Sequence, residues 1–271
     1  MVTLIATLLA QGLSLAATNY GADVPMHAPD TPPAWADEFR GKIDQTRWRF
    51  DTGRNRQGWA NHEKQYYAAD RRENARIEHG ALVIEARREA LSGQADWGGQ
   101  AYSSAKLVSR EALGYGFYEI RAKLPCGRGT WPAIWLLPEA GNWPDMGEID
   151  VMEMVGWQPL VVHATVHSGA FNHKQGTQRG AEIRVASACT AYHTYQLDWQ
   201  PHAITIGVDG HGYMRVADDQ PGGHAAWPFT VPYRLILNLA VGGDWGGAKG
   251  IDDGALPQRM SVDYVRYWRA S

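Results

Sequence analysis

The sequence predicts an all-β fold, and two observations support this prediction. Short runs with apolar side chains at every second position recur from about Trp35 onward, and they are rich in Val, Ile, Tyr and Trp. Gly, Pro, Asp and Asn punctuate the gaps between them, and no capped amphipathic stretch of helical length interrupts the series. Many short strands without alternating helices indicate an antiparallel sandwich or barrel.

Eight runs show the strand pattern most clearly, because in each of them apolar side chains recur at about every second position. These runs are Ala81–Arg87, Gly116–Leu124, Gly147–Met154, Leu160–His167, Tyr192–Trp199, Ala203–Gly210, Arg234–Val241 and Met260–Trp268.

Three segments divide the 271 residues. Residues 1–16 are apolar and uncharged, too short to span a bilayer, and end in a small-x-small pattern at Ser14 and Ala16. They predict a signal peptide and hence a secreted or periplasmic protein. We expect residues 17–34 to form a Pro-rich arm and residues 35–271 to form one folded domain without a repeat or a further boundary.

The composition excludes several classes of partner. The formal net charge is −3 and no run of Lys or Arg stands out, so we expect no nucleic acid and no membrane as partner. Twelve Trp and twelve Tyr against five Phe favour either core packing or flat platforms for sugar rings. Cys126 and Cys189 are the only cysteines, and in an exported protein such a pair predicts a disulfide.

One strand carries an unusual group of acids. Glu148, Asp150 and Glu153 interrupt an otherwise apolar run. Alternation places Glu148 and Asp150 on one face, whereas Glu153, five residues from Glu148, would point to the other face of a regular strand. A β-bulge at Val151-Met152 would return Glu153 to the face of the other two acids, and bulges are frequent beside active sites.

Two carboxyl groups on one face are the apparatus of glycoside hydrolysis. One carboxylate attacks the anomeric carbon, and the other group, protonated, gives its proton to the leaving oxygen. Asp150 between them separates the protonation states, because like charges at short range cannot all ionise. Across one bulged strand the two glutamates should lie about 5–6 Å apart, which is the geometry of a retaining enzyme.

The chain resembles glycoside hydrolase family 16, in its laminarinase-like branch with the bulged E-x-D-x-x-E motif. The resemblance extends from about Trp35 to Trp268. It implies a β-jelly-roll sandwich with a substrate cleft on its concave sheet. It also implies a retaining endo-β-1,3-glucanase with Glu148 as nucleophile, Asp150 as assisting acid and Glu153 as acid/base. Its segments are GYGFYEIRAKLP, GTWPAIWLLP, WPDMGEIDVMEMVG, HATVHSG, YHTYQLDWQPHAITIGVDG, PYRLILNLAVGGDWGG and MSVDYVRYW.

Four tryptophans near the acids are candidate sugar contacts, with core packing as the alternative. Trp131 and Trp135 share a strand face, and the resemblance places both in the cleft. Trp143 precedes the acids in a loop, and Trp245 lies in the glycine-rich GGDWGG.

Two polar residues, His167 and Asn61, are further candidate sugar contacts, and a third, Asn238, has two possible roles. His167 shares a strand face with His163, but the two side chains lie roughly 13 Å apart, which excludes a shared metal. His167 is the candidate sugar or acid/base contact, and a buried, satisfied His is the alternative. Asn61 lies in a segment that resembles the family's amino-terminal cleft segment, and it is the candidate sugar contact there. Asn238 is either a cleft group or a buried amide fully paired to backbone.

The catalytic mechanism requires no cofactor. The resemblance implies a structural calcium held by Asp263 and the carbonyls of Glu38 and Gly80, a mixed oxygen set of the kind that calcium prefers.

Other functions stay open. The alternatives are a hydrolase or transglycosylase of another polysaccharide (lichenan, agar or carrageenan type) and, disfavoured by the intact acids, a non-catalytic glucan-binding protein. We expect a monomer.

Overall fold

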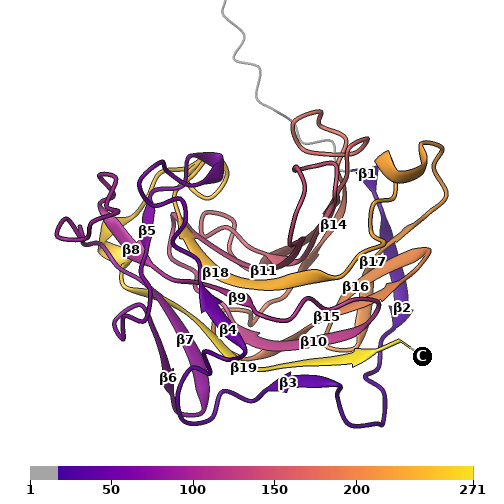
Figure 1. Ribbon diagram of the computed structural model, residues 1–271, viewed down its shortest axis with the longest axis horizontal. Coiled ribbons are helices and arrows are strands. Elements are labelled where there is room, and N and C mark those ends of the chain that lie inside the picture. The colour runs from indigo at the N-terminus through magenta and orange to yellow at the C-terminus, as the bar shows by residue number, and fades with distance from the viewer. Residues whose placement is uncertain (1–17, 271) are drawn as a thin grey trace, which may run out of the picture.

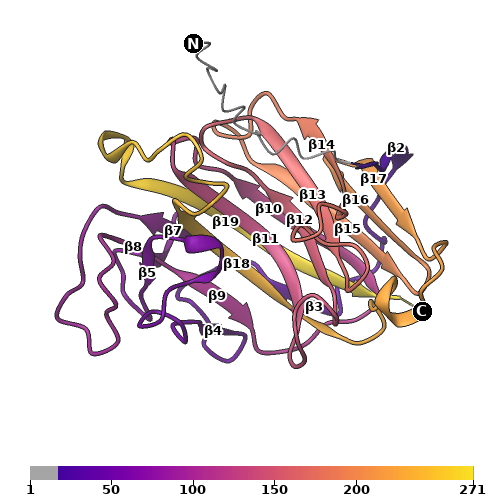
Figure 2. The same ribbon diagram turned by 90° about the horizontal axis from the view of Figure 1, so that it is seen from above.

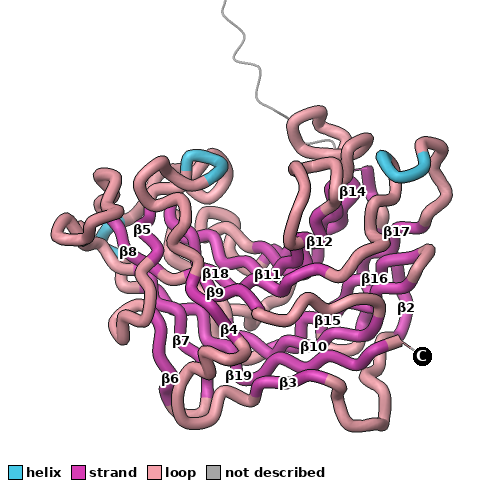
Figure 3. The backbone as a smooth tube through the Cα atoms, viewed as in Figure 1, coloured by secondary structure: helices cyan, strands magenta, loops and turns pink. Residues whose placement is uncertain are grey.

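The computed structural model describes residues 18–270, which form two stacked β-sheets with three short 3-10 turns (Figures 1 and 3). Every strand pair is antiparallel except β1 with β14 and β5 with β8. The all-β prediction is confirmed. The turns are η1 (Ala60–His62), η2 (Gly223–Ala225) and η3 (Asp253–Ala255).

The eight-stranded sheet holds, in spatial order, β1 (Thr18–Asn19), β14 (Arg179–Arg184), β13 (Val161–His167), β12 (Glu148–Glu153), β11 (Thr130–Pro138), β18 (Tyr233–Val241), β9 (Lys106–Ser109) and β4 (Trp48–Phe50).

The nine-stranded sheet lies beneath it in Figure 1. Its order is β2 (Gly21–Pro25), β17 (His211–Ala217), β16 (Ala203–Val208), β15 (His193–Gln200), β10 (Gly116–Lys123), β19 (Gln258–Arg269), β7 (Ala81–Ala86) and β6 (Ala75–Glu78), and β3 (Trp35–Asp37) also pairs with β19. A separate pair joins β5 (Gln65–Tyr67) to β8 (Tyr102–Ser104).

All eight runs expected as strands are strands, with ends displaced by at most a few residues. The agreement is good because each run buries one face between the sheets, and the alternation of its side chains records that burial. Leu197, Ile206 and Leu237, from three different runs, are fully buried in one continuous core.

The amino-terminal arm joins both sheets. Strand β1 pairs in parallel with β14, and β2 pairs with β17 at the edge of the other sheet. The arm therefore covers two edges that would otherwise expose unpaired backbone groups. The predicted signal peptide, residues 1–16, lies outside the described residues.

Two further features were tested by the fold. Cys126 and Cys189 form a disulfide with their Cα atoms 5.9 Å apart, which confirms the predicted pair. Among residues 18–270, no helix has the length and apolarity to cross a membrane.

The outer face of the eight-stranded sheet is flanked by loops at both ends (Figures 1 and 2). Turn η1 stands at one end, and the loops beside β12 and β14 stand at the other. Strands β11, β12 and β13 lie side by side between them.

Candidate active site

The predicted bulge is present in β12. Opposite β11, Asp150 pairs with Trp135 and Met152 pairs with Ile134, so one residue of β12 has no counterpart. Opposite β13, the register also shifts between Asp150 and Glu153. The bulge prediction is thus confirmed on both neighbouring strands.

The bulge changes which side chains face the core. Val151 and Met152 are consecutive, yet both are fully buried in the core between the sheets. Glu148 and Glu153 keep partial exposure, and Asp150 is 2% exposed. Two consecutive core residues reset the alternation, so Glu153 emerges on the side of Glu148 and Asp150.

The residue directly before β12, Gly147, must be a glycine for a steric reason. Gly147 has φ of 82°, in the left-handed region, and a Cβ atom there would collide with the hydroxyl of Tyr233. A larger residue would therefore displace the start of β12 and with it Glu148.

Each glutamate accepts a hydrogen bond from a tryptophan. Trp143, from the loop before β12, donates its indole N–H to Glu148 Oε2 at 2.5 Å. Trp131, from β11, donates to Glu153 Oε1 at 2.8 Å. These rings lie at the two ends of the acidic strand, so each one positions a different carboxyl group.

Burial and mutual repulsion raise the pKa values of all three acids. Burial is the larger cause for Glu148, repulsion from Asp150 adds to it, and the pKa reaches about 8. Burial raises the pKa of Glu153 to about 7, although the N–H of Trp131 opposes the rise. Burial, followed by the charge of Glu153, raises the pKa of Asp150 well above its ordinary value. The three acids therefore do not all ionise near neutral pH, and the group can hold the proton that acid catalysis requires.

His167 lies beside the middle acid. It pairs with Glu148 across the strands, and its Nε2 is 3.4 Å from Asp150 Oδ2. Its ring is 6% exposed and packs 5.8 Å from Trp143 and 5.1 Å from His173, between ring centroids. The sequence proposed His167 as a sugar or acid/base contact, with a buried, satisfied His as the alternative. The structure buries the ring beside Asp150 and leaves its Nδ1 without a partner.

Trp135 serves a different partner from Trp131. Its N–H donates to Asn238 Oδ1 at 2.6 Å, and Asn238 in turn donates to the hydroxyl of Tyr67 at 2.9 Å. Asn238 is therefore a buried amide, 6% exposed, and its partners are side chains. The sequence offered a cleft group or a buried amide paired to backbone, and the structure instead gives a buried amide paired to side chains.

The glycine-rich loop after β18 contacts β11 and β13, the two strands beside the acidic strand. Trp245 meets Trp131 edge to face, with 5.4 Å between ring centroids, and meets His163 in the same way at 4.9 Å. The backbone carbonyl of Asn61 accepts a hydrogen bond from the N–H of Asp244 at 2.8 Å, which joins η1 to this loop. The side chain of Asn61 is partly exposed.

Several groups near the site were not among the residues proposed for it from the sequence. Burial raises the pKa of Glu63, and the charge of Glu63 adds to the repulsion that raises the pKa of Glu153. Lys106 places its ammonium 4.8 Å from the ring centroid of Trp59 and 5.1 Å from that of Trp135. These contacts join segments far apart in the chain, and only pairing of the strands reveals them.

His173 and Lys174 form a second such group. The His173 ring lies 4.8 Å from Trp143, and the Lys174 ammonium also lies 4.8 Å from that ring. Burial is the main cause that lowers the pKa of His173 to about 4, so this ring is neutral at neutral pH. Both residues sit in a loop whose sequence is polar without a pattern.

The expected calcium ligands do not fit a calcium ion. The carboxylate of Asp263 contacts the guanidinium of Arg121, so its charge is already balanced. The side chain of Glu38 pairs with Arg266 at 2.8 Å. A divalent cation beside Arg121 would be repelled, and Gly80 and Glu38 offer only neutral carbonyls. We assign no calcium to these residues.

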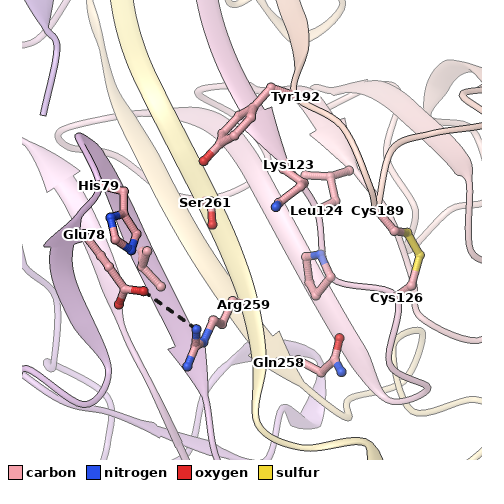
Figure 4. Close-up of a pocket in the computed structure, with 12 residues that line it drawn as sticks. Glu78, His79, Lys123, Leu124, Cys126, Cys189, Tyr192, Gln258, Arg259 and Ser261 are labelled. Carbon is pink, nitrogen blue, oxygen red and sulfur yellow. Dashed lines mark ion pairs between the residues drawn. A yellow bond between two sulfur atoms is a disulfide. The ribbon is translucent and has the colours of Figure 1, made fainter.

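A cavity of about 380 Å³ lies away from the acids, beside the disulfide (Figure 4). Tyr192, Lys123 and Arg259 border it, and Glu78 faces Arg259 there. Its lining contains neither Glu148 nor Glu153, so it is separate from the acidic strand.

A β-sandwich with paired, proton-retaining glutamates among tryptophans on one outer face defines a glycosidase. Comparison with known proteins agrees. The sequence profile described as Glycosyl hydrolases family 16 matches residues 62–266. The chain is 47% identical over 262 residues to a beta-glucanase of Rhodothermus marinus, covering 92% of this chain and 89% of that protein.

Two solved structures are similar throughout. One is SCLam, described as a non-specific endo-beta-1,3(4)-glucanase from family GH16, with TM-score 0.89 and 51% identity, covering 93% of this chain and 96% of that one. The other is the laminarinase from Rhodothermus marinus, with TM-score 0.82 and 46% identity, covering 90% and 99%. The chain belongs to glycoside hydrolase family 16, and it is an endo-acting glycosidase with the jelly-roll fold of that family, whose catalysis needs no cofactor.

Proposed function

We propose that the protein is an exported endo-β-1,3-glucanase that cleaves laminarin-type glucans with retention of configuration. The observation that carries the proposal is the bulged strand with Glu148, Asp150 and Glu153 on one side. The similarity to the two Rhodothermus marinus proteins and to SCLam supports a β-glucan as substrate. The apolar residues 1–16 support export, and the enzyme acts as a monomer.

Glu148 is the nucleophile and Glu153 is the acid/base in this proposal. Glu153 protonates the glycosidic oxygen while Glu148 attacks the anomeric carbon, which gives a covalent glycosyl-enzyme. Glu153, now ionised, then takes a proton from the water that hydrolyses the intermediate. Asp150, whose pKa burial raises well above its ordinary value, keeps a proton and shares a hydrogen bond with Glu148.

The aromatic residues favour a neutral sugar chain. Trp131 and Trp245 meet edge to face next to Glu153, and Trp143 stands next to Glu148. Indole faces suit the C–H faces of pyranose rings. Lys174 lies over Trp143, so the site has one cation at that end but no row of them along the acids. A sulfated galactan is therefore a weaker fit than a neutral glucan.

The test compares initial rates on laminarin, lichenan, carboxymethylcellulose and agarose at matched concentrations. We expect laminarin to be fastest, lichenan to be cut where 1,3-linked units occupy the site, and carboxymethylcellulose to be poor. Agarose turned over faster than laminarin would overturn the specificity and leave the mechanism intact. Analysis of products by chain length separates hydrolysis from transglycosylation, since the latter lengthens oligosaccharides. A protein that binds laminarin and releases no reducing sugar would instead be a binding protein.

A further inference from the structure

Two carboxylates and an imidazole converge on the acidic strand and its neighbour β13. Glu148, Asp150 and His167 each offer one ligand atom, and these three atoms lie within 4.8 Å of one another. Within residues 18–270, no other three Asp, Glu, His or Cys side chains converge in this way. The hydrolytic mechanism uses the acids and leaves the imidazole without a chemical step.

The spacing within this group suits zinc. His167 Nε2 and Asp150 Oδ2 are 3.4 Å apart. Two corners of a tetrahedron whose centre lies about 2.1 Å from each are also about 3.4 Å apart, and about 2.1 Å is the usual zinc distance to imidazole nitrogen and carboxylate oxygen. Glu148 supplies the third ligand atom, which lies within 4.8 Å of the other two, and it accepts from Trp143 through Oε2.

The two buried members have spare ligand capacity. Asp150 is 2% exposed, and its Oδ2, the atom facing His167, has no hydrogen-bond partner. His167 is 6% exposed, and its Nδ1 also lacks a partner. Buried polar atoms are normally satisfied, so an unpartnered carboxylate oxygen beside an imidazole nitrogen indicates room for a ligand between them.

We propose that Glu148, Asp150 and His167 bind one zinc ion reversibly and that this ion inhibits the enzyme. Two carboxylates and one imidazole are a common three-residue set for zinc, with the fourth position left to water. The site is reached from the outer face through Glu148, the partly exposed member.

Inhibition follows from the role of Glu148, and this step rests on the proposed function. A carboxylate oxygen coordinated to zinc cannot attack the anomeric carbon, and the ion blocks the approach of a sugar ring. Zinc should therefore compete with laminarin. Metal-bound imidazoles usually donate their second N–H to an acceptor, and Nδ1 of His167 has none, so binding should be weaker than at a structural zinc site.

Calorimetric titration with zinc acetate tests the site without substrate. The wild type should bind one zinc ion, and His167→Asn should weaken this binding at least about tenfold, since it removes a ligand. His163→Asn is the matched control: it is the same change on the same strand, and His163 faces Glu182 and Trp245 instead. Its zinc affinity should equal that of the wild type. Equal affinity of both variants, or no binding by the wild type, would overturn the proposal.

Glu148→Gln provides a second variant in case the His167 change disturbs the fold, which circular dichroism would show. It should also lose at least about tenfold in zinc affinity. In activity assays, zinc should raise the apparent KM for laminarin, and EDTA should restore it. Retained affinity in Glu148→Gln would refute the ligand assignment. Zinc binding in a protein without glucanase activity would refute the proposed function and leave the metal site standing.

Discussion

Trp131 donates its indole N–H to Glu153 at 2.8 Å from the adjacent strand β11. This bond acts against burial and against the charge of Glu148, both of which raise the pKa of Glu153. The ring is also held edge-on by Trp245. Trp131 thus positions the carboxyl group of Glu153, lowers its pKa, and places an indole ring beside it.

Trp131→Phe should shift the pH profile upward. The change keeps an aromatic ring but removes the N–H that stabilises ionised Glu153, so the pKa of Glu153 rises above about 7. The alkaline limb of kcat/KM should move to higher pH, which a rate series across pH measures. Trp135→Phe is the control, because that N–H serves Asn238. An alkaline limb that does not move in Trp131→Phe would contradict the assignment of Glu153 as the acid.

Glu148→Gln and Glu153→Ala should fail in different ways. Without the nucleophile no glycosyl-enzyme forms, and kcat should fall by at least about a thousandfold. Glu153→Ala should still react with substrates whose leaving group needs no proton, and azide should speed turnover and give a β-glycosyl azide. Activity of Glu148→Gln within about tenfold of wild type would sink the assignment of the nucleophile.

The buried acids should make the fold less stable as pH rises. The pKa of Glu148 is raised from 4.5 to about 8 on folding, so its contribution to stability is complete below pH 4.5 and is lost as pH rises through about 8. Glu148→Gln removes this loss. At pH 8.5 the variant should therefore have a higher Tm than the wild type, and its free energy of unfolding should be larger by about 1–3 kcal/mol. At pH 4.5 the difference should be smaller.

Exposed Glu111, changed in the same way, is the control for this effect, and it should leave the pH dependence of the Tm unaltered. Scanning calorimetry of both variants at the two pH values gives the comparison. A Glu148→Gln protein that melts below wild type at pH 8.5 would show that the charge is not costly in the fold.

The disulfide should contribute substantially to stability. Cys126 and Cys189 are 63 residues apart in sequence, and closing a loop of this length stabilises by about 4 kcal/mol in the chain-entropy model. The double change of both cysteines to Ser should lower the Tm, and a reducing agent should have no further effect on that variant. Two free thiols titrated in the exported wild-type protein would refute the pairing.

A chelator should leave the Tm unchanged. Arg121 balances Asp263, where the family resemblance implied calcium, so EDTA has no structural ion to remove at that position. Thermal melts with EDTA and with added calcium measure this directly. A Tm that falls with EDTA and recovers with calcium would show that the ion binds despite the guanidinium.

The sequence predicted correctly those features that depend only on residues close together along one strand. Alternation marked the eight long strands, and the spacing of Glu148, Asp150 and Glu153 was enough to predict the bulge. The fit of the calcium set depends on which side chain lies next to Asp263, and the sequence does not reveal that neighbour. Arg121 lies 142 positions earlier in the chain, and only the pairing of β10 with β19 brings it there.

The sequence by itself therefore determined the all-β class and the acidic strand with its bulge, because the side-chain period of a strand is a local property. Tertiary structure decided which groups adjust those acids. Trp131 donates a hydrogen bond to Glu153, and Trp143 donates one to Glu148. Trp135 donates to Asn238 instead, and His167 lies beside Asp150. These contacts depend on the register between strands and on the path of loops, and a shift of one residue in register would exchange every partner.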